Sequence, residues 1–167
     1  MTAEQKFISE RDCEFEVRLM ARRTALLYSA FAATLVDTFG EEEGRRLISE
    51  AIRVYGESCG SAIRDEVLAS GLPLSPENFS RPRDLPRYGF EHGKVQAADG
   101  ETHATVTFCP LAATFKAGGE RAQRLGRLYC NVDQAKQQAY NPAFACVHVK
   151  NVLDGDEFCE FQLKAEK

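Results

Sequence analysis

Residues 143–164 read AFACVHVKNVLDGDEFCEFQLK, and this stretch decides the fold. Two runs with strand-like alternation, 143–150 and 158–164, flank the turn-forming residues Leu153-Asp154-Gly155-Asp156. Two such runs joined by a short glycine-containing turn are typical of a β-hairpin. The C-terminal part of the chain is therefore predicted to end in two antiparallel strands.

A second hairpin pattern lies upstream, where residues 88–95 and 101–108 flank Ala98-Asp99-Gly100. Helical patterns separate the two hairpins, one at Leu111–Lys116 and one across 125–139. Strands joined by short turns, with the helices grouped, are typical of an antiparallel sheet covered on one face. The sequence predicts an α+β fold with about four strands.

Helical periodicity dominates residues 4–72 and is interrupted near Phe39-Gly40, where glycine suits a helix end. Gly56 and Gly60 are four residues apart inside this half. Either the helix breaks there, or another backbone approaches that face closely, and we favour close approach. Residues 73–87 contain four prolines and are predicted to be a linker across the surface.

The totals indicate a single domain, 1–167, made of a helical half (4–72), the linker (73–87) and a hairpin–helix–hairpin half (88–164). A net charge of -4 with a pI near 5.5 argues against nucleic-acid binding. No secretory signal or membrane span is recognisable, so we expect a cytoplasmic protein without a membrane partner. Six cysteines without a CxxC pair indicate free thiols, metal ligands or a nucleophile.

Cys130 and Asp133 are the first candidate site residues, because their spacing places them on one side of a helix, beside its apolar stripe. If the helix instead begins at Asn131, Cys130 lies just outside its N-terminus, where the helix dipole would lower the thiol pKa. Either geometry would permit a reactive thiolate. Asp133 would orient a base or a water molecule, or only cap the helix.

His103 and Cys109 alternate onto one face of their strand, so they are a candidate Cys–His pair. Cys159 shares a strand face with Phe161, as a core filler or as part of a site. We expect Cys109, Cys130 and Cys159 to converge, with Cys130 the most reactive thiol. These thiols and Asp133 could alternatively bind zinc, although no metal is predicted and the cofactor is unknown. In the preceding strand, alternation predicts that four side chains share one face, which could be a solvated one; they are Phe144, Cys146, His148 and Lys150. His148 is interpreted as a surface or packing residue.

A set of short motifs in the second half resembles the L-2-amino-thiazoline-4-carboxylic acid hydrolase family. The set consists of Cys109-Pro110, Cys130-x-x-Asp133, Tyr140-Asn141-Pro142, Gly155-Asp156 and Cys159-x-Phe161. The helical first half is similar to that family too. More distantly, the ending resembles ligand-binding domains of the 4-vinyl-reductase type, which are α+β modules for small molecules.

The resemblance implies a hydrolase that opens a cyclic isothiourea or amidine by cleaving carbon–sulfur or carbon–nitrogen, with a small molecule as partner. Cys130, Asp133, Cys109 and His103 are the catalytic candidates under this reading, and Asn141, Cys159 and Phe161 the substrate-binding ones. The alternative is a non-catalytic module that binds a small molecule or cofactor. Apolar patches on the long helices also lead us to expect a homodimer.

Overall fold

The computed structural model describes residues 8–82, 84–98 and 100–165. Two long helices come first, α1 (Glu10–Phe39) and α2 (Glu41–Ala69), followed by the 3-10 turn η1 (Pro76–Asn78). The remaining elements are β1 (Glu91–Gln96), β2 (Thr102–Phe108), α3 (Pro110–Ala117), α4 (Glu120–Tyr129), α5 (Val132–Tyr140), β3 (Phe144–Lys150) and β4 (Cys159–Ala165). The predicted α+β fold is confirmed; Asp99 of the expected first turn and residues 4–7 of the helical half lie outside the described residues.

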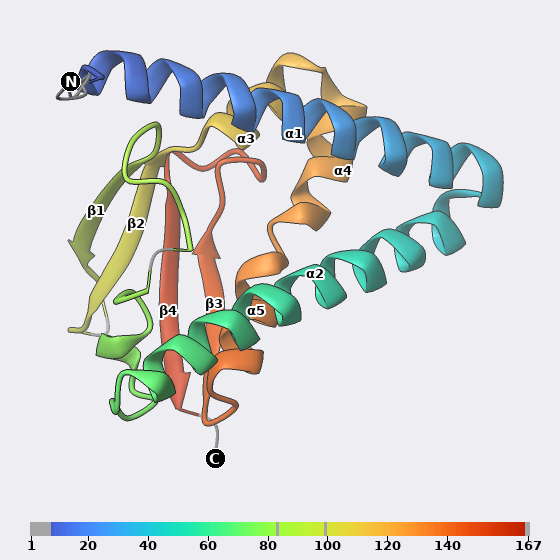
Figure 1. Ribbon diagram of the computed structural model, residues 1–167. Coiled ribbons are helices and arrows are strands. Elements are labelled where there is room, and N and C mark those ends of the chain that lie inside the picture. Colours follow the sequence, from blue (N-terminus) through green and yellow to red (C-terminus); the bar gives the residue numbers. More distant parts are fainter. Residues whose placement is uncertain (1–7, 83, 99, 166–167) are drawn as a thin grey trace, which may run out of the picture.

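The two long helices form a V that opens toward the sheet (Figure 1). Ser9 caps α1 by accepting a hydrogen bond from the Asp12 N–H. The chain reverses at Gly40, whose φ of 84° suits a residue without a side chain. Near this vertex, Val36 of α1 and Ile48 and Ile52 of α2 share an apolar cluster with α4. The predicted break at Phe39-Gly40 is therefore a sharp turn between two packed helices.

The four strands form one antiparallel sheet with the order β1-β2-β4-β3. Each predicted hairpin forms, and the pairing of β2 with β4 joins the two, with Val106 opposite Cys159. Helices α3, α4 and α5 connect the inner strand β2 to the outer strand β3. The expected four-stranded sheet is confirmed, and this connection brings α5 between α2 and β3 (Figure 1).

A register shift near the end of β3 separates Lys150 from the regular part of the strand. His148 pairs with Phe161, but Lys150 pairs with Glu160, the next residue back along β4. Neighbouring strand residues point to opposite faces, so His148 and Lys150 end on different faces of the sheet. The prediction that Phe144, Cys146 and His148 share one face is therefore confirmed, and the inclusion of Lys150 on that face is wrong.

Helix α2 stays unbroken through its two glycines, which face α5. A Cβ atom on Gly56 would lie 2.7 Å from the Ala135 Cβ and 2.8 Å from the Val132 carbonyl oxygen. At Gly60 it would overlap the Lys136 carbonyl oxygen. The favoured interpretation, close approach of another backbone, is confirmed.

Large apolar side chains remain exposed along the outside of α1. They are Phe15, Leu19, Met20, Leu26, Leu27 and Phe31, each between 38% and 64% exposed. Exposed apolar patches of this kind are common at protein interfaces, so the homodimer stays a prediction. No helix within the described residues has the length and apolar character needed to cross a membrane.

Replacing Gly60 with alanine should lower the free energy of unfolding by about 1–3 kcal/mol, since the new methyl group forces α5 away from α2. Alanine would otherwise favour the helix by about 1 kcal/mol, so the sign tests the close contact. Ser61→Ala, on the exposed side of α2, is the matched control and should change little. Urea unfolding followed by circular dichroism measures both; a Gly60→Ala variant at least as stable as the parent would contradict this packing.

Candidate functional site

A partly open cavity of about 140 Å³ lies between the sheet and the helices. Its wall is mostly apolar, with Val106 from β2, Phe115 from α3 and Tyr129 from α4. Polar side chains also reach this space, among them Asp133, Lys136, His148 and Asn151. An apolar cavity with a few convergent polar groups is typical of a small-molecule site.

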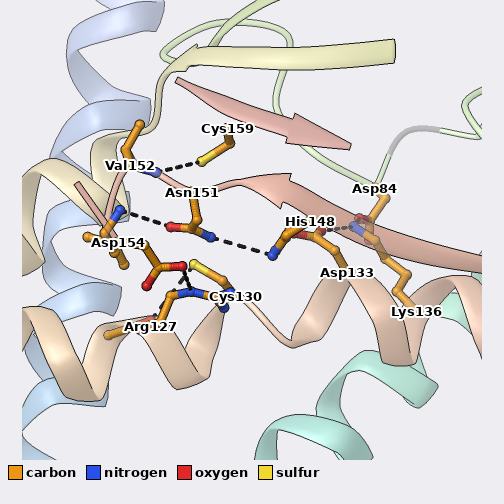
Figure 2. Close-up of polar contacts among 12 residues, drawn as sticks. Asp84, Arg127, Cys130, Asp133, Lys136, His148, Asn151, Val152, Asp154 and Cys159 are labelled. Carbon is orange, nitrogen blue, oxygen red and sulfur yellow. Dashed lines mark hydrogen bonds and ion pairs between the residues drawn. The ribbon is translucent and has the colours of Figure 1, made fainter. Parts of the chain in front are cut away.

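His148 and Asp133 form the central polar contact of this cavity (Figure 2). His148 Nε2 lies 3.3 Å from Asp133 Oδ2, and the His148 side chain is only 3% exposed. The Phe161 ring meets the imidazole edge-on, at 4.6 Å between ring centroids. Of the two interpretations of His148, a surface residue or a packing residue, the surface one is wrong. The regular pairing of β3 with β4 places His148 opposite Phe161, on the face that lines the cavity.

Asn151 fixes the other side of the imidazole. Its Oδ1 accepts the Leu153 backbone N–H at 2.9 Å, and this contact orients the amide so that Nδ2 lies 3.4 Å from His148 Nδ1. Because Nδ2 can only donate, Nδ1 is the acceptor. Nε2 therefore carries the hydrogen and donates to Asp133. The lone pair of Nδ1 therefore points toward the Asn151 amide.

Lys136 is a buried cation one turn after Asp133 on α5. Its Nζ lies 2.7 Å from Asp84 Oδ2 and 3.7 Å from Asp133 Oδ1, and its side chain is 9% exposed. Burial by itself would lower the pKa of Lys136, but the two carboxylates raise it above its ordinary value. The ammonium group is thus held in its charged form. Asp84 belongs to the linker, which therefore does more than cross the surface: it closes part of the cavity.

The thiols Cys109, Cys130 and Cys159 all line the cavity, as expected. Burial raises the pKa of Cys130 to about 12, an effect that a hydrogen bond from Asn151 opposes and the Asp133 charge increases. Cys130 follows α4 and precedes α5, but its sulfur lies 3.9 Å from the Gly126 carbonyl oxygen. The expected lowering of the Cys130 pKa by a helix N-terminus is therefore wrong, and the neutral thiol predominates at neutral pH.

Two predicted site residues lie outside the cavity. His103 is buried on the opposite face of β2, with Nδ1 2.8 Å from Glu160 Oε1. It does not pair with Cys109, because Cys109 lies beyond the end of the strand and turns to the cavity side. Asn141 follows α5 and donates from Nδ2 to the Leu74 carbonyl oxygen. Its role is to hold the linker, so both placements correct the sequence interpretation.

The alternative zinc site gains no support from the geometry. Within residues 8–82, 84–98 and 100–165, no three side chains of His, Cys, Asp or Glu are grouped so that they could hold a metal ion. The sequence reasoning also missed Asp84, Lys136 and Asn151 as site residues. Lys136 had a readable signal, because it follows Asp133 by three positions and so shares its helix face.

Alkylation should show that Cys130 is a slow thiol. Since the thiolate is the reactive form and burial raises the Cys130 pKa to about 12, iodoacetamide should label it much more slowly than an unfolded-chain cysteine at neutral pH. The rate should rise about tenfold per unit between roughly pH 8 and 10, without a plateau. Peptide mass spectrometry with urea-unfolded protein as control measures this. Fast labelling that levels off near neutral pH would contradict the buried neutral thiol.

Comparisons with known proteins agree with this architecture. The profile of the family described as L-2-amino-thiazoline-4-carboxylic acid hydrolase matches residues 20–163. No curated protein sequence matches the chain.

A similar solved structure is the trafficking protein particle complex subunit 3 from Naegleria fowleri, covalently bound to palmitic acid. The two sequences are 14% identical, and the superposition covers 89% of this chain and 96% of the other chain. The TM-score of 0.54 shows that the fold is shared. The family match spans most of the chain, including every element from the second half of α1 to β4. The chain therefore belongs to the L-2-amino-thiazoline-4-carboxylic acid hydrolase family.

Proposed function

We propose that this protein is a hydrolase that opens a small cyclic isothiourea of the 2-amino-thiazoline type by cleaving its carbon–sulfur bond. The observation that carries the proposal is the His148–Asp133 pair inside an otherwise apolar cavity. Such a pair moves protons, which is what the addition of water to an amidine-like carbon requires. Membership of the hydrolase family supports the same reaction class.

The proton balance assigns a role to each partner. Water adds its oxygen to the ring carbon between nitrogen and sulfur while His148 Nδ1 accepts a proton. That proton passes to the ring nitrogen, and the second water proton passes to the sulfur as the carbon–sulfur bond breaks. Asp133 stabilises the transient imidazolium through Nε2–H. The products of the step are a urea group and a thiol, so all atoms of water are accounted for.

Asn151 takes part by positioning the imidazole. Its 3.4 Å contact with Nδ1 is at the upper limit of a hydrogen bond, so a water molecule can replace it there. Cys130 lies beside Asn151 as a neutral thiol, and we assign it to binding of the ring. Cys109, Cys159 and Phe161 complete the wall around the substrate.

Replacing His148 with glutamine should lower kcat by about 10²–10⁴-fold on 2-amino-2-thiazoline-4-carboxylate, since general acid–base catalysis contributes that much. Asp133→Asn should also lower kcat, because the imidazolium loses its counter-charge. Cys130→Ser is the informative comparison and should keep kcat within about tenfold. Thiol release measured with a chromogenic disulfide follows turnover. If Cys130→Ser lost all activity while His148→Gln stayed active, the result would contradict the water mechanism and point to a thiol nucleophile.

A second candidate function is binding of an apolar carboxylic acid without turnover. It is favoured by the mostly apolar wall of the cavity and by its buried neutral thiols. The similar fold of a protein covalently bound to palmitic acid supports it at the level of architecture. Native mass spectrometry of freshly purified protein separates the two: a retained organic acid, with no turnover of the thiazoline, would favour binding.

A further inference from the structure

Lys136 is the cation that the proposed proton transfers do not use. It lies in the cavity wall, with its Nζ 6.0 Å from the centroid of the Phe79 ring. The Asp84 and Asp133 carboxylates also face this Nζ. Keeping an ammonium group this buried is costly unless it is paired. A buried cation in an apolar small-molecule cavity is a specific recognition element for an anion.

The two carboxylates that face Lys136 are held differently. Asp133 belongs to the first turn of α5 and is also engaged by His148 through its other oxygen. Asp84 comes from the linker, where the described residues between η1 and β1 form neither helix nor strand. Its side chain is 24% exposed, against 9% for Lys136, so it is the more accessible partner of the pair; Figure 2 shows it beside Lys136. Asp84 can leave Lys136 without disturbing any helix or strand.

We propose that Lys136 anchors the carboxylate of the ligand, and that Asp84 occupies this anchor until the ligand replaces it. The exchange substitutes one carboxylate for another, so the net charge around Lys136 is the same before and after binding. A ligand carboxylate that joined both aspartates would instead bring a third negative charge to a single ammonium group, which is unfavourable. Displacement of Asp84 is therefore part of binding. The cavity selects acids over their neutral amides, and Asp84 weakens their apparent affinity.

This inference rests on the proposed function in one respect, that the cavity is the ligand site. The test compares each acid with its amide: 2-amino-2-thiazoline-4-carboxylate with its carboxamide, and octanoate with octanamide. Dissociation constants are measured by calorimetry. If the parent protein hydrolyses the thiazoline, the measurements use the His148→Gln variant, so that the ligand stays intact. Two chemical series are used because a ring acid and a fatty acid would present the same carboxylate to Lys136.

Asp84→Asn should tighten binding of the acid by about tenfold and leave that of the amide nearly unchanged, since the competing charge is gone. Asp154→Asn is the matched control: it removes one carboxylate from the Arg127 ion pair outside the Lys136 contact. It should change neither constant. Lys136→Met alone would leave two carboxylates without their cation and could unfold the protein. The double variant Asp84→Asn/Lys136→Met avoids this, because it keeps the net charge of the parent. It should bind acid and amide alike.

Equal binding of acid and amide by the parent and by Asp84→Asn would overturn the anchor, as would failure of both acids to bind. Equal tightening of acid and amide in Asp84→Asn would also overturn it, because loss of the Asp84–Lys136 ion pair would then only loosen the linker over the cavity. Acid selectivity without thiazoline turnover would support the anchor and reject the hydrolase proposal. The series with the tighter acid identifies the ligand class.

Discussion

The close contact between α2 and α5 through Gly56 and Gly60 is the constraint on which the rest of the structure depends. Side chains normally keep helices 8–10 Å apart, and the two glycines remove that spacer. Their partners are Val132, Ala135 and Lys136, the residues that surround Asp133 on α5. The depth to which α5 sits on α2 therefore sets where the carboxylate and the ammonium group enter the cavity. A packing feature of the helical half thus positions the chemistry of the other half.

The apolar cavity changes the character of two of the groups that line it, the Cys130 thiol and the Lys136 ammonium group. The thiol of Cys130 is kept neutral, because a buried thiolate would lose its hydration, a cost that the nearby Arg127 charge offsets only in part. The neighbouring Lys136 stays charged because two carboxylates compensate its burial. Neutral thiols beside a compensated cation are what the proposed ligands require, since these combine an apolar or sulfur-containing body with an acidic group. Pairing, more than exposure, decides which charges persist here.

Much of the fold was predictable because its signals are local. Both hairpins, the reversal at Gly40 and the close approach at Gly56 and Gly60 follow from turn chemistry and periodicity. The spacing of Cys130 and Asp133 also led to residues that line the cavity. His103 was misjudged because alternation gives the face of a residue only while the strand continues.

The missed residues depend on information that no local pattern contains. His148 keeps the alternation of β3, but which face of that strand is buried depends on how β3 pairs with β4 and on the helices that cover the sheet. Asp84 reaches Lys136 across 52 positions from a segment without regular structure. The Cys130 pKa depends on how deeply the surrounding helices bury the sulfur, which is a property of the assembled core. Pairings of this kind appear only once the chain is folded.

The turn between β3 and β4 has a consequence for how the protein can change over evolutionary time. Surface turns between strands usually tolerate insertions and deletions. Here the Asn151 backbone N–H donates to Asp156 while its side chain accepts from Leu153 and faces His148. Gly155, with a φ of 104°, allows the chain to close this arrangement. The length of an outwardly ordinary loop is therefore tied to the orientation of one imidazole ring, so sequence drift here should exchange residues without adding or removing any.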